Sequence, residues 1–294
     1  MHWKRITVVG VGLLGGSLGL ALRRRRLADT VVGYVRRAAS VTECEWLGAV
    51  DQATRDLEEA VSGAEMVVLC TPIAQMRKLV EQMLPALEPG AILTDVGSVK
   101  ESVVRDLEPL AEEAGARFIG SHPIAGAEKT GVTAARADLF SGAVCVVTPT
   151  RKSDAVAVRR VEALWKAVGG RVLRFRPEVH DELVSRTSHL PHIVATQLAS
   201  FVLSPEHSKM QTTLCGNGFR DTTRVASSSP EMWRDIALSN RAQLLRALGD
   251  FAETLDQFRR FLERGDAEAI SGLFKQAKGR RDRWLRRACP EKRA

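Results

Sequence analysis

Residues 6–20 read ITVVGVGLLGGSLGL, and this stretch decides the fold. A β-branched run is followed by glycines at 10, 12 and 15 and then by small residues typical of a helix start. In a strand–loop–helix of this kind, Gly10 permits the tight turn, Gly12 lets the backbone approach a pyrophosphate, and Gly15 lets helix and strand pack closely. The free N–H groups of the helix start then favour phosphate. The stretch predicts a dinucleotide site, and the alternative is that the glycines serve packing alone.

The end of the second predicted strand indicates which dinucleotide is bound. The segment VVGYVRR (31–37) carries Val35, Arg36 and Arg37 where NAD-binding chains carry an acid for the ribose 2′-hydroxyl. A carboxylate would repel a 2′-phosphate, whereas guanidinium groups pair with it bidentately. The pattern favours NADP over NAD, and the alternative is that both arginines form a solvated strand end. The residues expected to contact the cofactor are Gly10, Gly12, Leu13, Leu14, Gly15, Arg36, Arg37, Thr71 and Pro72.

The first part of the chain alternates short β-rich runs with helical stretches. We predict strands at Ile6–Gly10, Val31–Val35, Met66–Thr71, Ile92–Val96, Arg117–Ile119, Val144–Thr148 and Arg171–Phe175. We predict helices at about 15–27, 38–47, 55–62, 74–84, 99–114 and 153–168. This alternation predicts an α/β fold, a Rossmann-type doubly wound and mainly parallel sheet with helices on both faces.

The pattern changes after Pro177, where only long amphipathic segments follow, at about 178–203, 208–216, 230–262 and 266–287. A broad apolar face recurs at helical spacing through Leu244, Leu248, Phe251, Leu255, Phe258 and Leu262. This face is too long for so small a domain to cover, so we expect an all-α domain that forms a homodimer. A core made within one chain is the alternative. The expected domains are a dinucleotide-binding domain at 1–175 and a helical substrate and dimerisation domain at 176–294.

Composition excludes several classes of protein. The 294 residues are 45% hydrophobic, and no run approaches the ~18–20 apolar residues of a membrane span. The N-terminus runs straight into a strand pattern and lacks a signal-peptide cleavage site. Five cysteines without CxxC pairs indicate reduced thiols in a cytoplasmic protein, with neither a disulfide frame nor a metal site. The net charge is +8, but no nucleic-acid-binding motif accompanies it, so we assign the positive charge to small anionic ligands.

Three further stretches carry polar groups suited to chemistry. They are ILTDVGSVK (92–100), FIGSHPIAGAEKTGV (118–132) and, in the helical part, SHLPH (188–192) with GFRDTTRVASSSPEMWRD (218–235). The first two follow predicted strands, and the carboxyl edge of such a sheet borders the ligand crevice. We therefore expect Ser98 at this edge and His122 in a small-residue loop beside it.

Together these motifs resemble the prephenate/arogenate (cyclohexadienyl) dehydrogenase family, the TyrA-type enzymes of tyrosine biosynthesis. The resemblance covers nearly the whole chain, and SHPIAGAEKTGV followed by GFRDTTR is its most specific part. It implies oxidative decarboxylation of prephenate, arogenate or both, with hydride transfer to NAD(P)+. The product is 4-hydroxyphenylpyruvate or tyrosine.

The resemblance also implies the catalytic residues. His122 matches the family's catalytic histidine, which accepts a hydrogen bond from the 4-hydroxyl of the substrate ring. An imidazole suits this task because its unperturbed pKa of ~6.5 lies near working pH. Ser98 matches a serine that bridges the substrate hydroxyl and the nicotinamide. A helix N-cap is the alternative for Ser98, and both roles are compatible.

Four more residues match family positions that contact or surround the substrate. Arg224 matches the arginine that holds a substrate carboxylate, with Arg220 as the near competitor. Glu128 matches an acid that pairs with this arginine and gates the pocket, and a plain surface glutamate is the alternative. His192 matches a substrate contact. Trp233 matches an aromatic residue near the active site, and core packing is the alternative for it.

The remaining histidines of the helical part are interpreted as structural. His189 and His192 are three residues apart, a spacing that could place both on one metal ion. We expect no metal site here, because no third ligand is evident and the family chemistry needs no metal. His180 is interpreted as structural as well. Pro191 marks a kink or a helix start, because proline cannot complete the helical hydrogen-bond ladder.

Two other function classes stay open. One is another Rossmann-plus-helical-domain dehydrogenase or reductase, of the β-hydroxyacid or pyrroline-carboxylate type, which usually places a lysine or a differently spaced acid/base on the helical domain. The other is a non-catalytic NADP-binding sensor. We expect no mutase segment and no regulatory domain in this chain, so that any feedback by tyrosine would act by competition at the substrate site.

Overall fold

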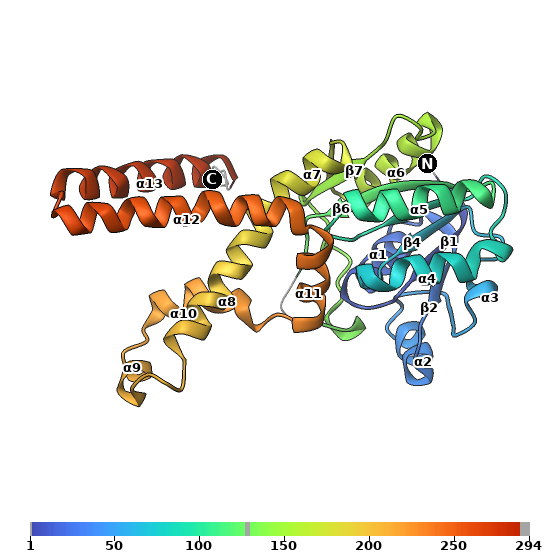
Figure 1. Ribbon diagram of the computed structural model, residues 1–294. Helices are drawn as coiled ribbons and strands as arrows, with labels where there is room; N and C mark the ends of the chain where they lie inside the picture. The colour runs from blue at the N-terminus through green and yellow to red at the C-terminus, as the bar shows by residue number, and fades with distance from the viewer. Residues whose placement is uncertain (1, 127–129, 289–294) are drawn as a thin grey trace, which may run out of the picture. The chain divides into compact units, whose positions relative to one another are not determined.

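The computed structural model describes residues 2–126 and 130–288 of the chain (Figure 1). By their internal contacts the residues form two compact units, Met1–Leu244 and Leu245–Ala294. The first unit contains a sheet and the helices around it. The second unit contains two long helices.

The sheet of the first unit has eight strands in the order β3-β2-β1-β4-β5-β6-β7-β8. The strands are β1 (Trp3–Val9), β2 (Ala28–Tyr34), β3 (Gln52–Thr54), β4 (Met66–Leu69), β5 (Ile92–Asp95), β6 (Arg117–Pro123), β7 (Val144–Thr148) and β8 (Arg171–Arg174). Neighbouring strands are parallel except β6 and β7, which are antiparallel. The predicted Rossmann-type, mainly parallel sheet is confirmed.

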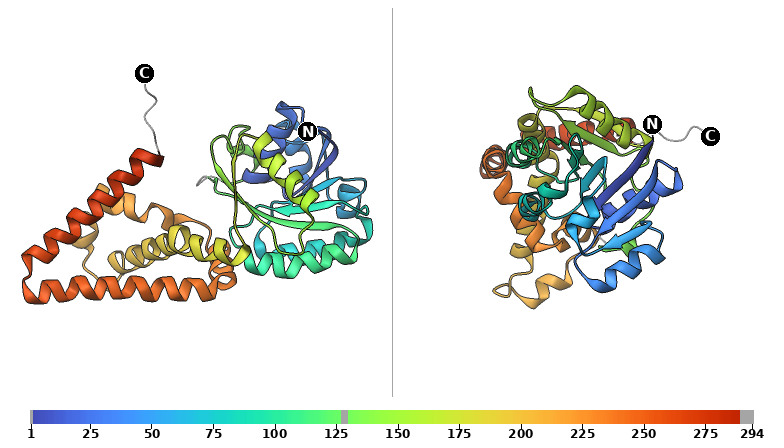
Figure 2. Two further views of the ribbon diagram at one scale, coloured as in Figure 1. Left: turned by 90° about the horizontal axis from the view of Figure 1, so that it is seen from above. Right: turned by 90° about the vertical axis from the view of Figure 1, so that its right-hand side faces the viewer.

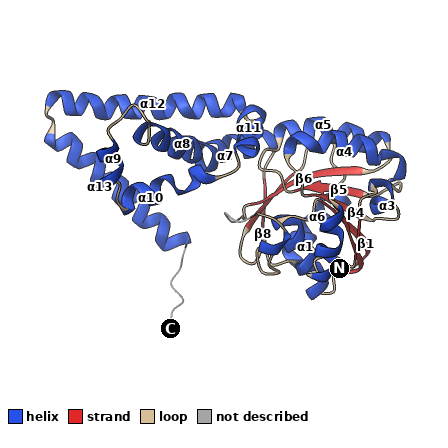
Figure 3. Cartoon of the chain, turned by 90° about the horizontal axis from the view of Figure 1, so that it is seen from below, coloured by secondary structure: helices blue, strands red, loops and turns tan. Residues whose placement is uncertain are grey.

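Helices cover both faces of this sheet (Figure 3). On one face α1 (Leu13–Arg24) and α6 (Ala155–Ala167) pack against the strands. On the other face lie α3 (Leu57–Val61), α4 (Ile73–Met83) and α5 (Glu101–Glu113), and α2 (Ala38–Trp46) follows β2. Because both faces are covered, the central strand β4 is buried at every position.

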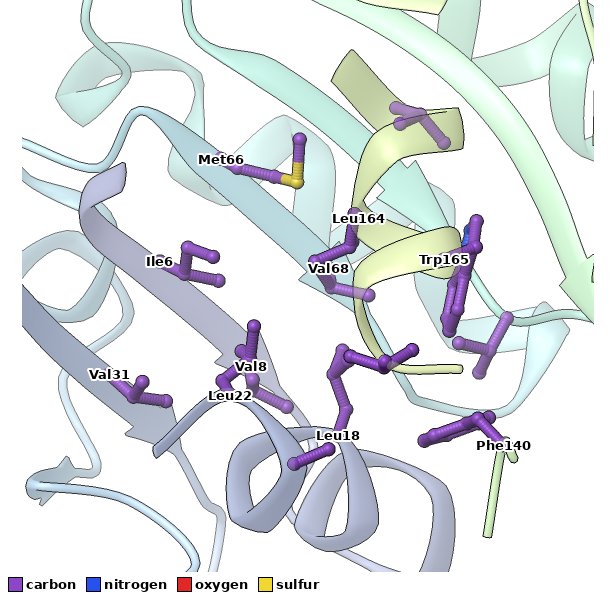
Figure 4. Close-up of a cluster of buried hydrophobic side chains, with 14 of the residues drawn as sticks. Ile6, Val8, Leu18, Leu22, Val31, Met66, Val68, Phe140, Leu164 and Trp165 are labelled. Carbon is purple, nitrogen blue, oxygen red and sulfur yellow. The ribbon is translucent and has the colours of Figure 1, made fainter. Parts of the chain in front are cut away.

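The core on the α1 and α6 face shows how the sequence pattern becomes packing. Figure 4 shows Leu18 and Leu22 of α1 pointing toward Ile6 and Val8 of β1, and all four side chains are fully buried. Trp165 of α6 packs on Phe140 in the same cluster, and its indole N–H donates to Ser121 Oγ at 3.0 Å. Burying each large side chain of this kind contributes about 1.5–3 kcal/mol to the free energy of unfolding.

Two local differences separate this sheet from the prediction. The strand β3 was not predicted, because three residues are too short to show a period. The first helix ends at Arg24 rather than near 27, because Arg26 adopts a left-handed conformation with φ of 52°. The chain then turns directly into β2.

The predicted helical segment at 178–203 is helical throughout, with a π-helical turn inside it, whereas the later segments of the first unit are shorter than predicted. The helical segments are α7 (Pro177–Val184), a π-helical turn at Ser185–His189, α8 (Leu190–Val202), α9 (Lys209–Thr213), α10 (Asn217–Thr223), a 3-10 turn at Arg224–Ser227 and α11 (Pro230–Ser239). Pro191 lies just after the π-helical turn, and the chain is helical without a break from 177 to 202, so Pro191 does not start a separate helix. The predicted helix at 230–262 is broken at Asn240, which is buried and donates to Asp181 O at 2.9 Å.

The second unit consists of most of α12 (Arg241–Arg264) and of α13 (Ala267–Ala288). Gly265 joins them with φ of +64°, and the two helices diverge from this turn (Figure 2). Phe258 and Phe274 touch edge to face at 6.1 Å, yet Leu262, Phe274 and Trp284 each expose more than half of their surface. In the described ranges, no helix combines the length and apolarity needed to cross a membrane.

Candidate active site

The loop between β1 and α1 has the geometry that a dinucleotide-binding turn requires. Gly10 lies at φ of +98°, which side chains rarely adopt. A Cβ atom at Gly15 would lie 2.1 Å from the Gly10 carbonyl oxygen, so only glycine lets α1 start this close to the loop. At Gly12 no atom lies within 4 Å of the Cβ position, and the backbone there is open to a ligand. Leu13 and Leu14 are half-buried against the core.

A pocket of about 430 Å³ opens beside this loop. Its lining residues are Gly10, Val11, Gly12, Tyr34, Val35, Arg36, Arg37, Ser40, Cys70, Thr71, Pro72, Gln75 and Leu79. Six of the nine residues predicted to contact the cofactor are among them. The other three, Leu13, Leu14 and Gly15, form the first turn of α1.

The wall of this pocket after β2 is positively charged. Arg36 and Arg37 are exposed, and Arg55 donates from Nε to the Arg36 carbonyl at 3.2 Å. Among the described residues that line the pocket there is no aspartate or glutamate. Sequence reasoning missed Arg55, because it follows the short strand β3.

His122 lies on strand β6, paired with Val146 of β7. Its predicted place in a loop is wrong, because antiparallel pairing with β7 extends β6 from Ile119 to Pro123. Alternation along the strand buries Ser121 on one face and leaves His122 half-buried on the other. His122 Nδ1 lies 2.9 Å from Nε2 of His180 on α7.

A fully buried polar network lies behind His122. Lys100 forms an ion pair with Asp95, and its Nζ also donates to the Ser121 carbonyl at 2.9 Å. The Asp181 carboxylate accepts from the Lys100 and Glu101 backbone N–H groups at 2.8 and 2.9 Å. This carboxylate thereby satisfies free donors at the start of α5, where the helix dipole favours negative charge.

A second cluster joins α8 to α11. The His192 ring stacks on Trp233, with ring centroids 3.6 Å apart, and His192 Nε2 lies 3.4 Å from Ser228 Oγ. Trp233 also meets the edge of His189 at 5.9 Å. Nδ1 of His189 accepts from Asn240 Nδ2 at 3.2 Å. Within the described chain the buried indole N–H of Trp233 has no hydrogen-bond partner.

Ser98 and Arg224 border this second cluster. Ser98 is half-buried after β5. Burial lowers the pKa of His189, and the backbone carbonyl of Ser98 raises this pKa by a smaller amount. Burial lowers the pKa of His192, and the nearby Arg224 guanidinium lowers this pKa further. Arg220 lies on α10 and is exposed. The structure thus brings Ser98, Arg224 and Trp233 to the cluster of His189 and His192. Glu128 lies outside the described residues.

Burial keeps the histidines of both clusters neutral. It lowers the pKa of His122 well below 6.5, with His180, Lys100 and His189 acting in the same direction. It likewise lowers the pKa of His180, which the hydrogen bond to Asp181 opposes. The pKa of His189 falls to about 4. A neutral His122 is able to accept a proton from a ligand at ordinary pH.

Two protein-family models match the sequence of this chain. The model of the prephenate dehydrogenase nucleotide-binding domain matches residues 18–174, and that of the prephenate dehydrogenase dimerization domain matches residues 176–276. The chain belongs to the prephenate dehydrogenase family.

Individual proteins of the prephenate dehydrogenase family are similar to this chain in sequence and structure over almost its whole length. Prephenate dehydrogenase of Bacillus subtilis is 36% identical over 94% of this chain and 75% of its own length. The crystal structure of prephenate dehydrogenase from A. aeolicus with hydroxyphenyl propionate and NAD+ is 34% identical, with a TM-score of 0.89, over 96% of this chain and 99% of that one. Synechocystis arogenate dehydrogenase is 32% identical, with a TM-score of 0.81, over 96% and 100%.

Four polar residues of this prephenate dehydrogenase family chain escaped sequence reasoning. The interpretation of His180 as structural missed its hydrogen bond to His122, and Asp181, Asp95 and Lys100 were not singled out. In the sequence, the feature that could have indicated this network is the adjacent His-Asp pair at 180–181 near a helix start. Their importance depends on the topology, which brings α7 against β6 and α5.

Proposed function

We propose that this chain oxidatively decarboxylates prephenate, arogenate or both, with hydride transfer to NAD(P)+, as a step of tyrosine biosynthesis. The observation that carries the proposal is His122 on strand β6, hydrogen-bonded to His180 and kept neutral by burial, in a chain of this family that also has a dinucleotide pocket. A neutral imidazole is the group needed to accept a proton while hydride leaves the same substrate centre.

The cofactor fits the residues that are present. Gly12 leaves backbone open where a pyrophosphate would approach, and α1 offers its N-terminal N–H groups. A bound nicotinamide would supply the acceptor for the hydride of the ring carbon that bears the 4-hydroxyl. The part of the pocket that is lined by residues following β2 and β4 would hold the adenosine end of the cofactor.

The chain's own residues then handle the proton and the carboxylates. His122 accepts the 4-hydroxyl proton as hydride departs, the ring carboxylate leaves as CO2, and the ring becomes aromatic. The imidazolium returns the proton to the phenolate oxygen, so the residue ends as it began. Ser98 bridges the hydroxyl and the nicotinamide, and Arg224 holds a substrate carboxylate. In this assignment His192 and Trp233 line the substrate position, and the pairing of Glu128, which lies outside the described residues, with Arg224 stays a prediction.

Initial rates test the proposal, measured for prephenate and for arogenate, each with NADP+ and with NAD+. We expect turnover of at least one acid. Cofactor binding without turnover of either acid would reject the activity and favour a non-catalytic sensor.

We further propose that NADP is preferred over NAD. Arg36 and Arg37 line the pocket where the ribose 2′-position would lie, Arg55 donates to the Arg36 carbonyl beside them, and no described carboxylate lines the pocket. Replacing Arg36 and Arg37 together by alanine should weaken NADP+ binding by roughly 10- to 100-fold, since charge-assisted hydrogen bonds contribute about 1.5–3 kcal/mol. Binding of NAD+ should change less than threefold, and titration calorimetry with both cofactors measures this. Equal losses for the two cofactors would contradict the preference.

We also propose a homodimer, with the dinucleotide-binding domain at 1–175 and the substrate and dimerisation domain at 176–294. The exposed Leu262, Phe274 and Trp284 support a partner surface on the second unit, and the dimerization-domain match supports it as well. Sedimentation should give twice the 32.2 kDa mass of the chain. Leu262→Glu with Phe274→Glu should shift the mass to one chain, whereas Leu173→Glu at an exposed site on β8 should not.

A further inference from the structure

A continuous line of hydrogen bonds runs from the buried start of α5 to His122. Asp181 Oδ1 lies 2.7 Å from His180 Nδ1, and His180 Nε2 lies 2.9 Å from His122 Nδ1. His180 and Asp181 are almost completely buried, whereas His122 is half-buried. The bond to His180 is the side-chain hydrogen bond of His122 to the described residues.

The chemistry of the groups sets the direction of these bonds. Asp181 accepts two backbone N–H groups, and an ionised carboxylate has no proton to give, so His180 Nδ1 must be the donor. A neutral His180 then has a lone pair on Nε2, which accepts the Nδ1 proton of His122. The remaining nitrogen of His122, Nε2, therefore carries a lone pair.

The surrounding charges keep both rings neutral. Burial lowers the pKa of His122 and of His180, and the Lys100 ammonium of α5 acts in the same direction on both. His189 lowers the pKa of His122 as well, while Asp181 and Asp95 oppose the shift at His180. Protonation of either ring would cost the desolvation that burial imposes.

We propose that His180, oriented by Asp181, is a positioning residue that fixes the ring and tautomer of His122 and so keeps its Nε2 free to accept the substrate proton. The proposal rests on the proposed function, because the proton is that of the 4-hydroxyl. It also explains why a His-Asp pair is buried here: the pair selects one of two tautomers that are close in energy in free imidazole. The arrangement follows the logic by which an aspartate orients a catalytic histidine, with one more imidazole in the line.

Two substitutions separate hydrogen bonding from packing. His180→Phe keeps an aromatic ring and removes the acceptor. His180→Gln packs less well, but its amide oxygen can accept from His122 while its NH2 group faces Asp181. The proposal predicts that kcat falls roughly 10- to 100-fold in His180→Phe and less than tenfold in His180→Gln, with KM nearly unchanged. A structural role predicts the reverse order. His2→Phe, which breaks an exposed His–Asp pair, is the matched control and should keep wild-type kcat.

The tautomer is read directly, without turnover, from 15N-histidine NMR spectra of the wild-type chain. The chain has six histidines, and the His122 signals are those lost in His122→Asn. We expect an Nδ1–H tautomer for His122 in wild type and in His180→Gln, and a shift toward Nε2–H in His180→Phe. An Nε2–H tautomer in wild type, or a higher kcat in His180→Phe than in His180→Gln, would overturn the proposal. If wild type turns over neither acid, the proposed function fails, and the wild-type tautomer still decides the hydrogen-bond direction.

Discussion

Replacing His122 by alanine is expected to lower kcat by about 10²–10⁴-fold, the range of a lost general base. Cofactor binding should stay within threefold of wild type, because His122 lies on β6 and does not line the dinucleotide pocket. Stopped-flow rates and cofactor titration measure the two quantities. Activity retained in His122→Ala, with loss only on mutating a residue of the helical segments, would favour the β-hydroxyacid or pyrroline-carboxylate type of dehydrogenase instead.

The pH dependence of the wild type tests the same residue. Activity needs neutral His122, and burial with the charges of His180 and Lys100 lowers its pKa well below 6.5. A lowered pKa keeps the neutral form at more acidic pH. The value of kcat/KM should therefore stay level from about pH 8 to 6.5 and fall only below this range. An acidic limb centred at or above the ordinary histidine pKa would contradict the burial argument.

Replacing Lys100 by methionine is expected to give the largest loss of stability. Lys100 and Asp95 have no exposed surface, and the substitution leaves the Asp95 charge buried without its partner. Removing one partner of a buried pair costs about 3–5 kcal/mol of the free energy of unfolding. The urea midpoint of the sheet-containing unit measures this loss.

A matched control uses the same chemical change at an exposed pair. Lys278 pairs with Asp282 on the surface of α13, and Lys278→Met should change the free energy of unfolding by less than about 1 kcal/mol. Adding Asp95→Asn to Lys100→Met removes the unpaired charge and should restore part of the stability. If Lys100→Met were as stable as Lys278→Met, the buried Lys100–Asp95 ion pair would not contribute to the free energy of unfolding as predicted.

Local sequence patterns predicted the parts of this molecule that depend on neighbours along the chain. The glycine loop, the parallel strands and the helical segment near 178–203 follow from turn chemistry and periodicity within a few residues. The resemblance of SHPIAGAEKTGV to a family motif led to the prediction that His122 is catalytic, although the prediction that His122 lies in a loop was wrong. The antiparallel partner that extends β6 comes from residues beyond 140, which no local pattern reveals.

The parts that escaped prediction depend on contacts between distant segments. His180 is 58 residues from His122, and only the packing of α7 against the sheet edge joins them. Lys100 looks like a polar residue before a helix, because its burial against Asp95 and Ser121 depends on the neighbouring strand β6. Asn240 breaks a segment with continuous helical periodicity, because its side chain bonds the Asp181 backbone.

The stoichiometry of a complete reaction shows whether this chain couples oxidation of the substrate to its decarboxylation. Limiting prephenate, and in parallel limiting arogenate, is incubated with excess NADP+ or NAD+, and reduced cofactor, CO2 and aromatic product are all quantified. We expect one reduced nicotinamide, one CO2 and one aromatic product for each molecule of the accepted acid. Reduced cofactor without matching CO2, or no consumption of either acid by a chain that binds the cofactor, would contradict the proposed function.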